Sequence, residues 1–159
     1  MSTNPYAAPK AAVSDIEVEE FQEINLWSAE GRIGRLRYLA YNFAPALLVG
    51  AVSGLMTVAV DPGTAGILTL LLYIPLLWFS IVTGIKRSHD MNWSGWSILL
   101  TIIPLVALIW VFKPGSDGSN DYGAPPPPNT GGVKILALAL PIIAIVGIIA
   151  AIAIPALAR

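Results

Sequence analysis

Four long apolar runs divide the chain, and polar segments separate them. The runs cover residues 39–60, 65–85, 93–112 and 135–158. A helix needs about 20 apolar residues to cross a hydrocarbon core of about 30 Å, and each run approaches or exceeds this length. Because the backbone in lipid must satisfy its own hydrogen bonds, we predict an all-α fold, a polytopic helical membrane protein with four transmembrane helices.

The polar segments complete the predicted domain organisation. Residues 1–30 form an acidic, disordered tail, residues 31–124 form a membrane domain with the first three helices, and residues 125–134 form a Pro- and Gly-rich linker to the fourth.

The second half of the tail has a pattern of its own. From Asp15 onward, acidic residues alternate with apolar ones at helical spacing; the apolar set is Val18, Phe21, Ile24 and Trp27. This pattern is compatible with a short helix on the membrane surface or on a partner. A solvated acidic linker fits it equally well, because acids oppose binding to an anionic leaflet.

Composition agrees with the membrane prediction. Hydrophobic residues make up 55% of the chain and charged residues only 12%, whereas soluble domains carry about 25% charged residues. The formal net charge of −1 gives no reason to expect a nucleic-acid partner. The absence of cysteine excludes disulfides, thiolate metal sites and a thiol nucleophile.

The basic residues predict an orientation. They gather at the ends of the apolar runs, and the positive-inside rule places the richer ends in the cytoplasm. With four spans, the cytoplasmic set is Arg32, Arg35, Arg37, Lys86, Arg87 and Arg159, and the outer set is Lys113 and Lys134. We therefore predict that both termini are cytoplasmic and that residues 63 and 122 are on the outer face, with residue 90 inside.

The loop from Lys86 to Trp96 gathers the sole histidine, a carboxylate, two cations and two tryptophans. We expect an interfacial clamp in which Arg87 and His89 contact lipid phosphate or Glu30, while Asp90 restrains one arginine. Exposed pairs of this kind contribute about 0.2–1 kcal/mol. The candidate interaction residues are Arg32, Arg35, Arg37, Arg87, His89, Asp90, Trp93 and Trp96.

No catalytic, cofactor-binding or metal-ligating residue is predicted. His89 and Asp90 are adjacent, and successive side chains on a helix do not face each other. A metal site would need Asp61 or Asp121 as well, and four alternating spans place both on the opposite face from His89. We therefore expect neither a cofactor nor an enzymatic activity.

Partners are expected within the bilayer. Gly50 and Gly54 form a GxxxG pair that allows close helix approach, which we interpret as internal packing ahead of a dimer interface. Membrane lipids are the expected ligands, and a protein partner or a second copy would bind through the transmembrane helices. The proline tract, residues 125–128, is interpreted as a stiff spacer.

Three motifs in order carry a family resemblance. GRIGRLRY precedes the first run, KRSHDMNWSGW precedes the third, and FKPGSDGSNDYG follows it. Together, over Gly31 to Ala124, they resemble the bacterial inner-membrane family known as domain of unknown function 805. The resemblance implies a small helical inner-membrane protein, and it supplies no activity, substrate or catalytic residue.

The fourth run has a second resemblance. GIIAAIAIPA, from Gly147 to Ala156, is similar to the hydrophobic start of a type IV pilin. The segment stands at the other end of the chain from a prepilin's and lacks the processing junction and the glutamate. We interpret it as convergence on a good packing helix, and we predict no cleavage at Gly147.

These observations favour a non-enzymatic structural or protein-interaction component of the inner membrane. The alternative is a small transporter or channel component, because four helices can line a narrow path. Against this alternative, the predicted spans contain no ionisable side chain, which transporters usually keep inside the bilayer.

Overall fold

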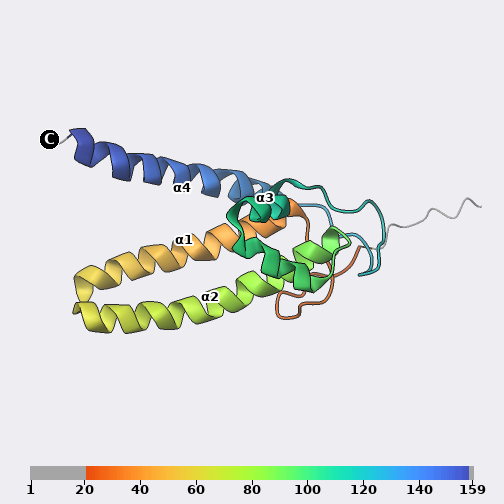
Figure 1. Cartoon of the computed structure of the whole chain (residues 1–159), viewed down its shortest axis with the longest axis horizontal. Helices are drawn as coiled ribbons and strands as arrows, with labels where there is room; N and C mark the ends of the chain where they lie inside the picture. The colour runs from red at the N-terminus through yellow and green to blue at the C-terminus, as the bar shows by residue number, and fades with distance from the viewer. Residues whose placement is uncertain (1–20, 158–159) are drawn as a thin grey trace, which may run out of the picture.

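The computed structural model describes residues 21–157 and builds them around a long antiparallel pair of helices (Figure 1). α1 covers Arg35–Ala59 and α2 covers Pro62–Asp90. Their connection lies at one end of the molecule, and the polar loops lie at the other. Over the described residues there are helices and no strand, which confirms the all-α prediction.

The turn between α1 and α2 is set by local chemistry. The Asp61 carboxylate accepts a hydrogen bond of 3.1 Å from the Thr64 backbone N–H and so caps α2. Pro62 follows at the first helical position, where no N–H is needed. The hydrogen bonds from Thr64 lower the pKa of the Asp61 carboxyl.

α2 is longer than a bilayer crossing requires. Its 29 residues extend about 43 Å, whereas a hydrocarbon core is about 30 Å thick. The last turns, which carry Lys86 to Asp90, therefore project toward the polar loops. This projection is what places the charged residues of α2 in the candidate site.

The third apolar run differs from its prediction, because it is not one helix. A 3₁₀ helix, η1, covers Gly95–Ile102, and a short α-helix, α3, covers Pro104–Phe112. Pro104 cannot donate a backbone hydrogen bond, and Ile103 before it is extended, so the two pieces do not join. Nine α-helical residues reach only about 13 Å, which is too short to cross.

Both ends of this segment lie at the polar end of the molecule. Its first residue, Gly95, comes shortly after Asp90, the last residue of α2. At its far end the Phe112 carbonyl accepts a hydrogen bond from Arg35 at the start of α1. The alternation that would place residues 86–96 and 113–134 on opposite faces is therefore wrong. The segment leaves the polar end and returns to it.

α4 covers Gly131–Leu157 and lies along α1 (Figure 1). It starts at the polar end, where Thr130 accepts hydrogen bonds from the backbone of Val133 and Lys134. Its far end lies at the same end of the molecule as the α1–α2 turn. In the described residues α1, α2 and α4 are the three helices long and apolar enough to cross a membrane.

Two further predictions concern the acidic stretch before α1 and the glycine pair within α1. Phe21 to Glu30 contain no helix, and the rest of the acidic stretch lies outside the described residues. A Cβ added at Gly50 or Gly54 would meet no atom within 4 Å outside its own stretch of helix. The GxxxG pair is therefore not a close helix contact inside this chain, contrary to the internal-packing interpretation.

Candidate functional site

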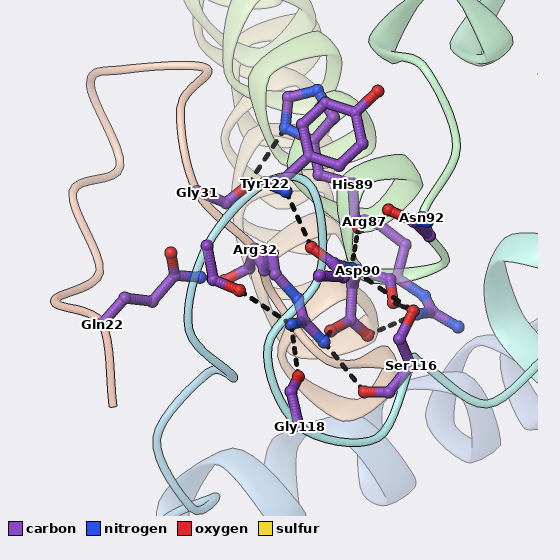
Figure 2. Close-up of polar contacts among 12 residues, drawn as sticks. Gln22, Gly31, Arg32, Arg87, His89, Asp90, Asn92, Ser116, Gly118 and Tyr122 are labelled. Carbon is purple, nitrogen blue, oxygen red and sulfur yellow. Dashed lines mark hydrogen bonds and ion pairs between the residues drawn. The ribbon is translucent and has the colours of Figure 1, made fainter. Parts of the chain in front are cut away.

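Asp90, the last residue of α2, lies at the centre of the polar end (Figure 2). Its Oδ1 accepts from the Arg32 guanidinium at 3.2 Å, and its Oδ2 accepts from Arg87 at 2.7 Å. The three residues are 3%, 1% and 0% exposed, respectively. One buried carboxylate therefore holds two buried arginines, one just before α1 and one in the last turn of α2.

Arg32 also binds the loop that follows α3. Its Nη1 donates to the carbonyl oxygens of Gly118 at 2.7 Å and Gly123 at 3.1 Å, and its Nη2 donates to Ser116 O at 2.9 Å. Ser116 returns two hydrogen bonds to the Asp90 carbonyl, from its backbone N–H and its hydroxyl. These contacts fold residues 113–123 over the end of α2 (Figure 2).

Arg87 ties α2 to the end of α3. Its Nε donates to Trp110 O at 2.9 Å, and its Nη2 donates to the Lys113 carbonyl. The last carbonyls of a helix lack partners within the helix and carry its negative dipole end. The Trp110 indole N–H in turn donates to the buried Ser88 hydroxyl at 3.0 Å.

Glycines let the loop approach this closely. A Cβ at Gly115 would lie 2.2 Å from Asp90 Oδ2, so only glycine fits against the carboxylate. Gly118 and Gly123 have φ of +62° and +112°, a region that side chains disfavour. Those two residues present the carbonyls that Arg32 binds, so the turn geometry and the arginine contacts depend on each other.

His89 belongs to the outer edge of this network. Its ring stacks on Tyr122 at 3.9 Å between centroids with an interplanar angle of 4°. Its Nδ1 lies 3.2 Å from the Gly31 carbonyl, which can only accept, so Nδ1 carries the proton. Asn120 donates to the His89 carbonyl at 2.8 Å. The histidine ring therefore contacts Tyr122 and the Gly31 carbonyl, whereas lipid phosphate or Glu30 was the expected partner.

The expected separation of Asp121 from this loop is also corrected. The Asn92 side chain donates to the Asp121 carboxylate at 3.2 Å and accepts from the Asp121 backbone N–H at 3.3 Å. Asn92 has φ of +57°, which ends the chain's helical path after α2. Both acidic loops thus lie at one end, although no group of three His, Asp or Glu residues in the described range could hold a metal ion.

The remaining predicted residues separate into buried and exposed sets. Arg37 is buried and donates to the carbonyls of Pro127 and Pro128, while Arg35 is exposed. Trp93 packs edge-on against Trp110, with ring centroids 5.6 Å apart. Trp96 is 79% exposed and belongs to no polar network of the described residues. Four members of the predicted set are therefore buried, and three of them, Arg32, Arg87 and Asp90, are joined by the two ion pairs of Asp90.

The expected weak, exposed ion pairs are the largest error in the site prediction. The pairs are buried, and removing one member of a buried pair costs about 3–5 kcal/mol, well above the 0.2–1 kcal/mol of exposed pairs. Prediction also missed the loop partners Gly115, Ser116, Gly118 and Gly123 and the buried Trp110. Their signal was the glycine density of PGSDGSNDYG, because backbone carbonyls are the ligands there.

The family model described as "Protein of unknown function (DUF805)" matches residues 26–124. The chain belongs to this family. All contacts of Asp90, Arg32 and Arg87 described above lie inside the DUF805 region, and α4 lies outside it. Searches of curated proteins and of solved structures gave no match, and the pilin resemblance of Gly147 to Ala156 is not confirmed.

Proposed function

We propose that this DUF805 protein is a non-enzymatic structural or protein-interaction component of the bacterial inner membrane. One observation carries the proposal: the buried carboxylate of Asp90 and the His89 ring are both held by protein groups. Both Asp90 oxygens accept from arginines, and the His89 ring is stacked and hydrogen-bonded. A general acid or base needs access to a substrate proton, whereas both Asp90 oxygens and His89 Nδ1 face protein atoms.

The proposal includes a topology with three spans. Six basic residues lie at or near the polar ends of the three long helices: Arg32, Arg35, Arg37, Lys86, Arg87 and Lys134. A seventh, Lys113, follows α3 at the same end. The positive-inside rule then places this end in the cytoplasm, together with the start of α1. The segment η1–α3 is re-entrant, and the end of α4 reaches the opposite face. This proposal replaces the predicted cytoplasmic C-terminus with an outer one.

Reporter fusions test this topology. We expect fusions at residues 90 and 122 to report the cytoplasm and fusions at residues 63 and 157 to report the outer face. The reason is that residues 89 and 120 are joined by a hydrogen bond and lie on one side. Residues 122 and 157 distinguish three spans from four, because four spans would place residue 122 outside and residue 157 in the cytoplasm. An outer signal at residue 122 would contradict the re-entrant segment.

The functional class is tested by proximity labelling of the full chain in its native membrane. The same labelling on His89→Ala separates recognition from architecture, because His89 is only half-buried and its loss leaves the Asp90 pairs intact. We expect an unchanged partner set at near-normal abundance. Loss of specific partners at normal abundance would make the His89 edge a recognition surface instead.

One observation favours the alternative, a small transporter or channel component. Broken helices and re-entrant segments line substrate sites in many transporters, and η1–α3 is a segment of this kind. Reconstitution into liposomes with entrapped ions or dyes tests it directly. Flux that disappears when Pro104 is replaced by alanine would support transport and displace the structural proposal.

A further inference from the structure

An open apolar groove runs along α3 and ends at a cation. It is lined by Trp93, Leu108, Ile109, Phe112 and Lys113, with a volume of about 480 Å³. Leu108 and Phe112 are one helical turn apart and exposed, so they present one side of α3. The Lys113 ammonium lies 4.0 Å from the centre of the Trp93 ring at the rim of this groove.

Most other cations of the polar end are already engaged. Arg32 and Arg87 are held by Asp90, Arg37 donates to proline carbonyls, and Lys86 donates to the Glu30 carbonyl. Arg35 differs, because it is exposed and makes one long hydrogen bond, 3.4 Å, to Phe112 O. Two cations, Arg35 and Lys113, therefore flank the exposed Phe112 at the end of the groove.

We propose that this groove binds an anionic phospholipid. The headgroup phosphate contacts Lys113, with Arg35 as the second positive charge, and one acyl chain lies along Leu108, Ile109 and Phe112. Charge complementarity selects the headgroup, because cations at the membrane surface attract anionic lipids. The apolar lining selects a chain over a free phosphate. The site requires insertion in a membrane and does not depend on which face is cytoplasmic.

Native mass spectrometry of the purified full chain in a neutral detergent tests the site. Phosphatidylglycerol and phosphatidylcholine with identical acyl chains are titrated separately, and glycerol phosphate supplies the headgroup without a chain. The variants are Lys113→Gln, which removes the charge, and Lys113→Arg, which keeps it. Lys134→Gln is the matched control, because Lys134 is an exposed cation at the same end, in the first turn of α4.

We expect the unmodified chain to prefer phosphatidylglycerol over phosphatidylcholine and to bind no glycerol phosphate. Lys113→Gln should lower the affinity for phosphatidylglycerol about fivefold, while Lys113→Arg and Lys134→Gln leave it unchanged. Phe112→Ala should weaken binding of both lipids. If Lys113→Gln does not fold, this second variant decides, because Phe112 is 68% exposed and its loss should leave the fold intact.

Three results would overturn the site. Equal losses in Lys113→Gln and Lys134→Gln would mean diffuse attraction to the basic end. Unchanged lipid binding in Phe112→Ala would remove the groove from the interaction. Glycerol phosphate that binds as well as the lipid would reduce the site to an anion contact without a chain.

Discussion

Replacing Asp90 with alanine should lower the free energy of unfolding by about 3–5 kcal/mol. The change removes the carboxylate and leaves Arg32 and Arg87 buried without a counter-charge, at 1% and 0% exposure. Charged groups in such surroundings are expensive because the interior does not replace their hydration. Denaturant titration in mild detergent, followed by circular dichroism, measures the effect, and membrane abundance should fall with it.

Asp117→Ala is the matched control for this change. Asp117 lies in the loop that covers Asp90 and is exposed, and a surface substitution of this kind usually changes stability by less than about 0.5 kcal/mol. Asp90→Asn keeps the shape and an acceptor oxygen but not the charge, and it should fall between the two. Equal stability of Asp90→Ala and Asp117→Ala would show that the buried pairs do not hold the polar end together.

Gly115→Ala should destabilise the protein by about 1–3 kcal/mol, the usual cost of overpacking. The new Cβ would lie 2.2 Å from Asp90 Oδ2 and 2.6 Å from its Cγ. The carboxylate cannot move aside without breaking one of its arginine contacts. Thermal melting of the detergent-solubilised protein measures the change. Gly34→Ala is the control, because a Cβ there meets no atom within 4 Å.

A double-mutant cycle measures the coupling between Asp90→Ala and Gly115→Ala. In an Asp90→Ala background the carboxylate is absent, so Gly115→Ala should cost little more. The coupling energy should therefore be about as large as the cost of Gly115→Ala alone, within the range seen for residues in contact. Additive effects would mean that the glycine serves the turn itself and not the approach to Asp90.

Three of the apolar runs were predictable as long helices because length and hydropathy are local properties. The runs at 39–60, 65–85 and 135–158 fall inside α1, α2 and α4 or within a residue or two of their ends. Family membership was also readable from the sequence, through three motifs in order. The sequence therefore determined the all-α class, the family and most of the residues that gather at the polar end.

The third run shows a feature that length and hydropathy did not predict, the break at Pro104. Pro45 and Pro141 lie about as far from the starts of their helices, α1 and α4, as Pro104 lies from Gly95, the start of η1. All three prolines lie in apolar runs. Among the described helices only this run breaks at its proline, although its length and hydropathy resemble those of the other runs. The tertiary contacts decide, because Arg35 and Arg87 bind the carbonyls at the end of α3 and hold it at the polar end.

The burial and pairing of the charged residues were even less predictable from local properties. The sequence indicated that Arg32, Arg87 and Asp90 matter, but exposure and partners depend on the path of the backbone. Arg32 and Asp90 are 58 positions apart, and the loop that covers them comes from a third segment. The sequence by itself determined that these charges stand at helix ends. Only the tertiary structure decided that they are buried against each other, because burial requires that segments distant in the chain fold over the same end.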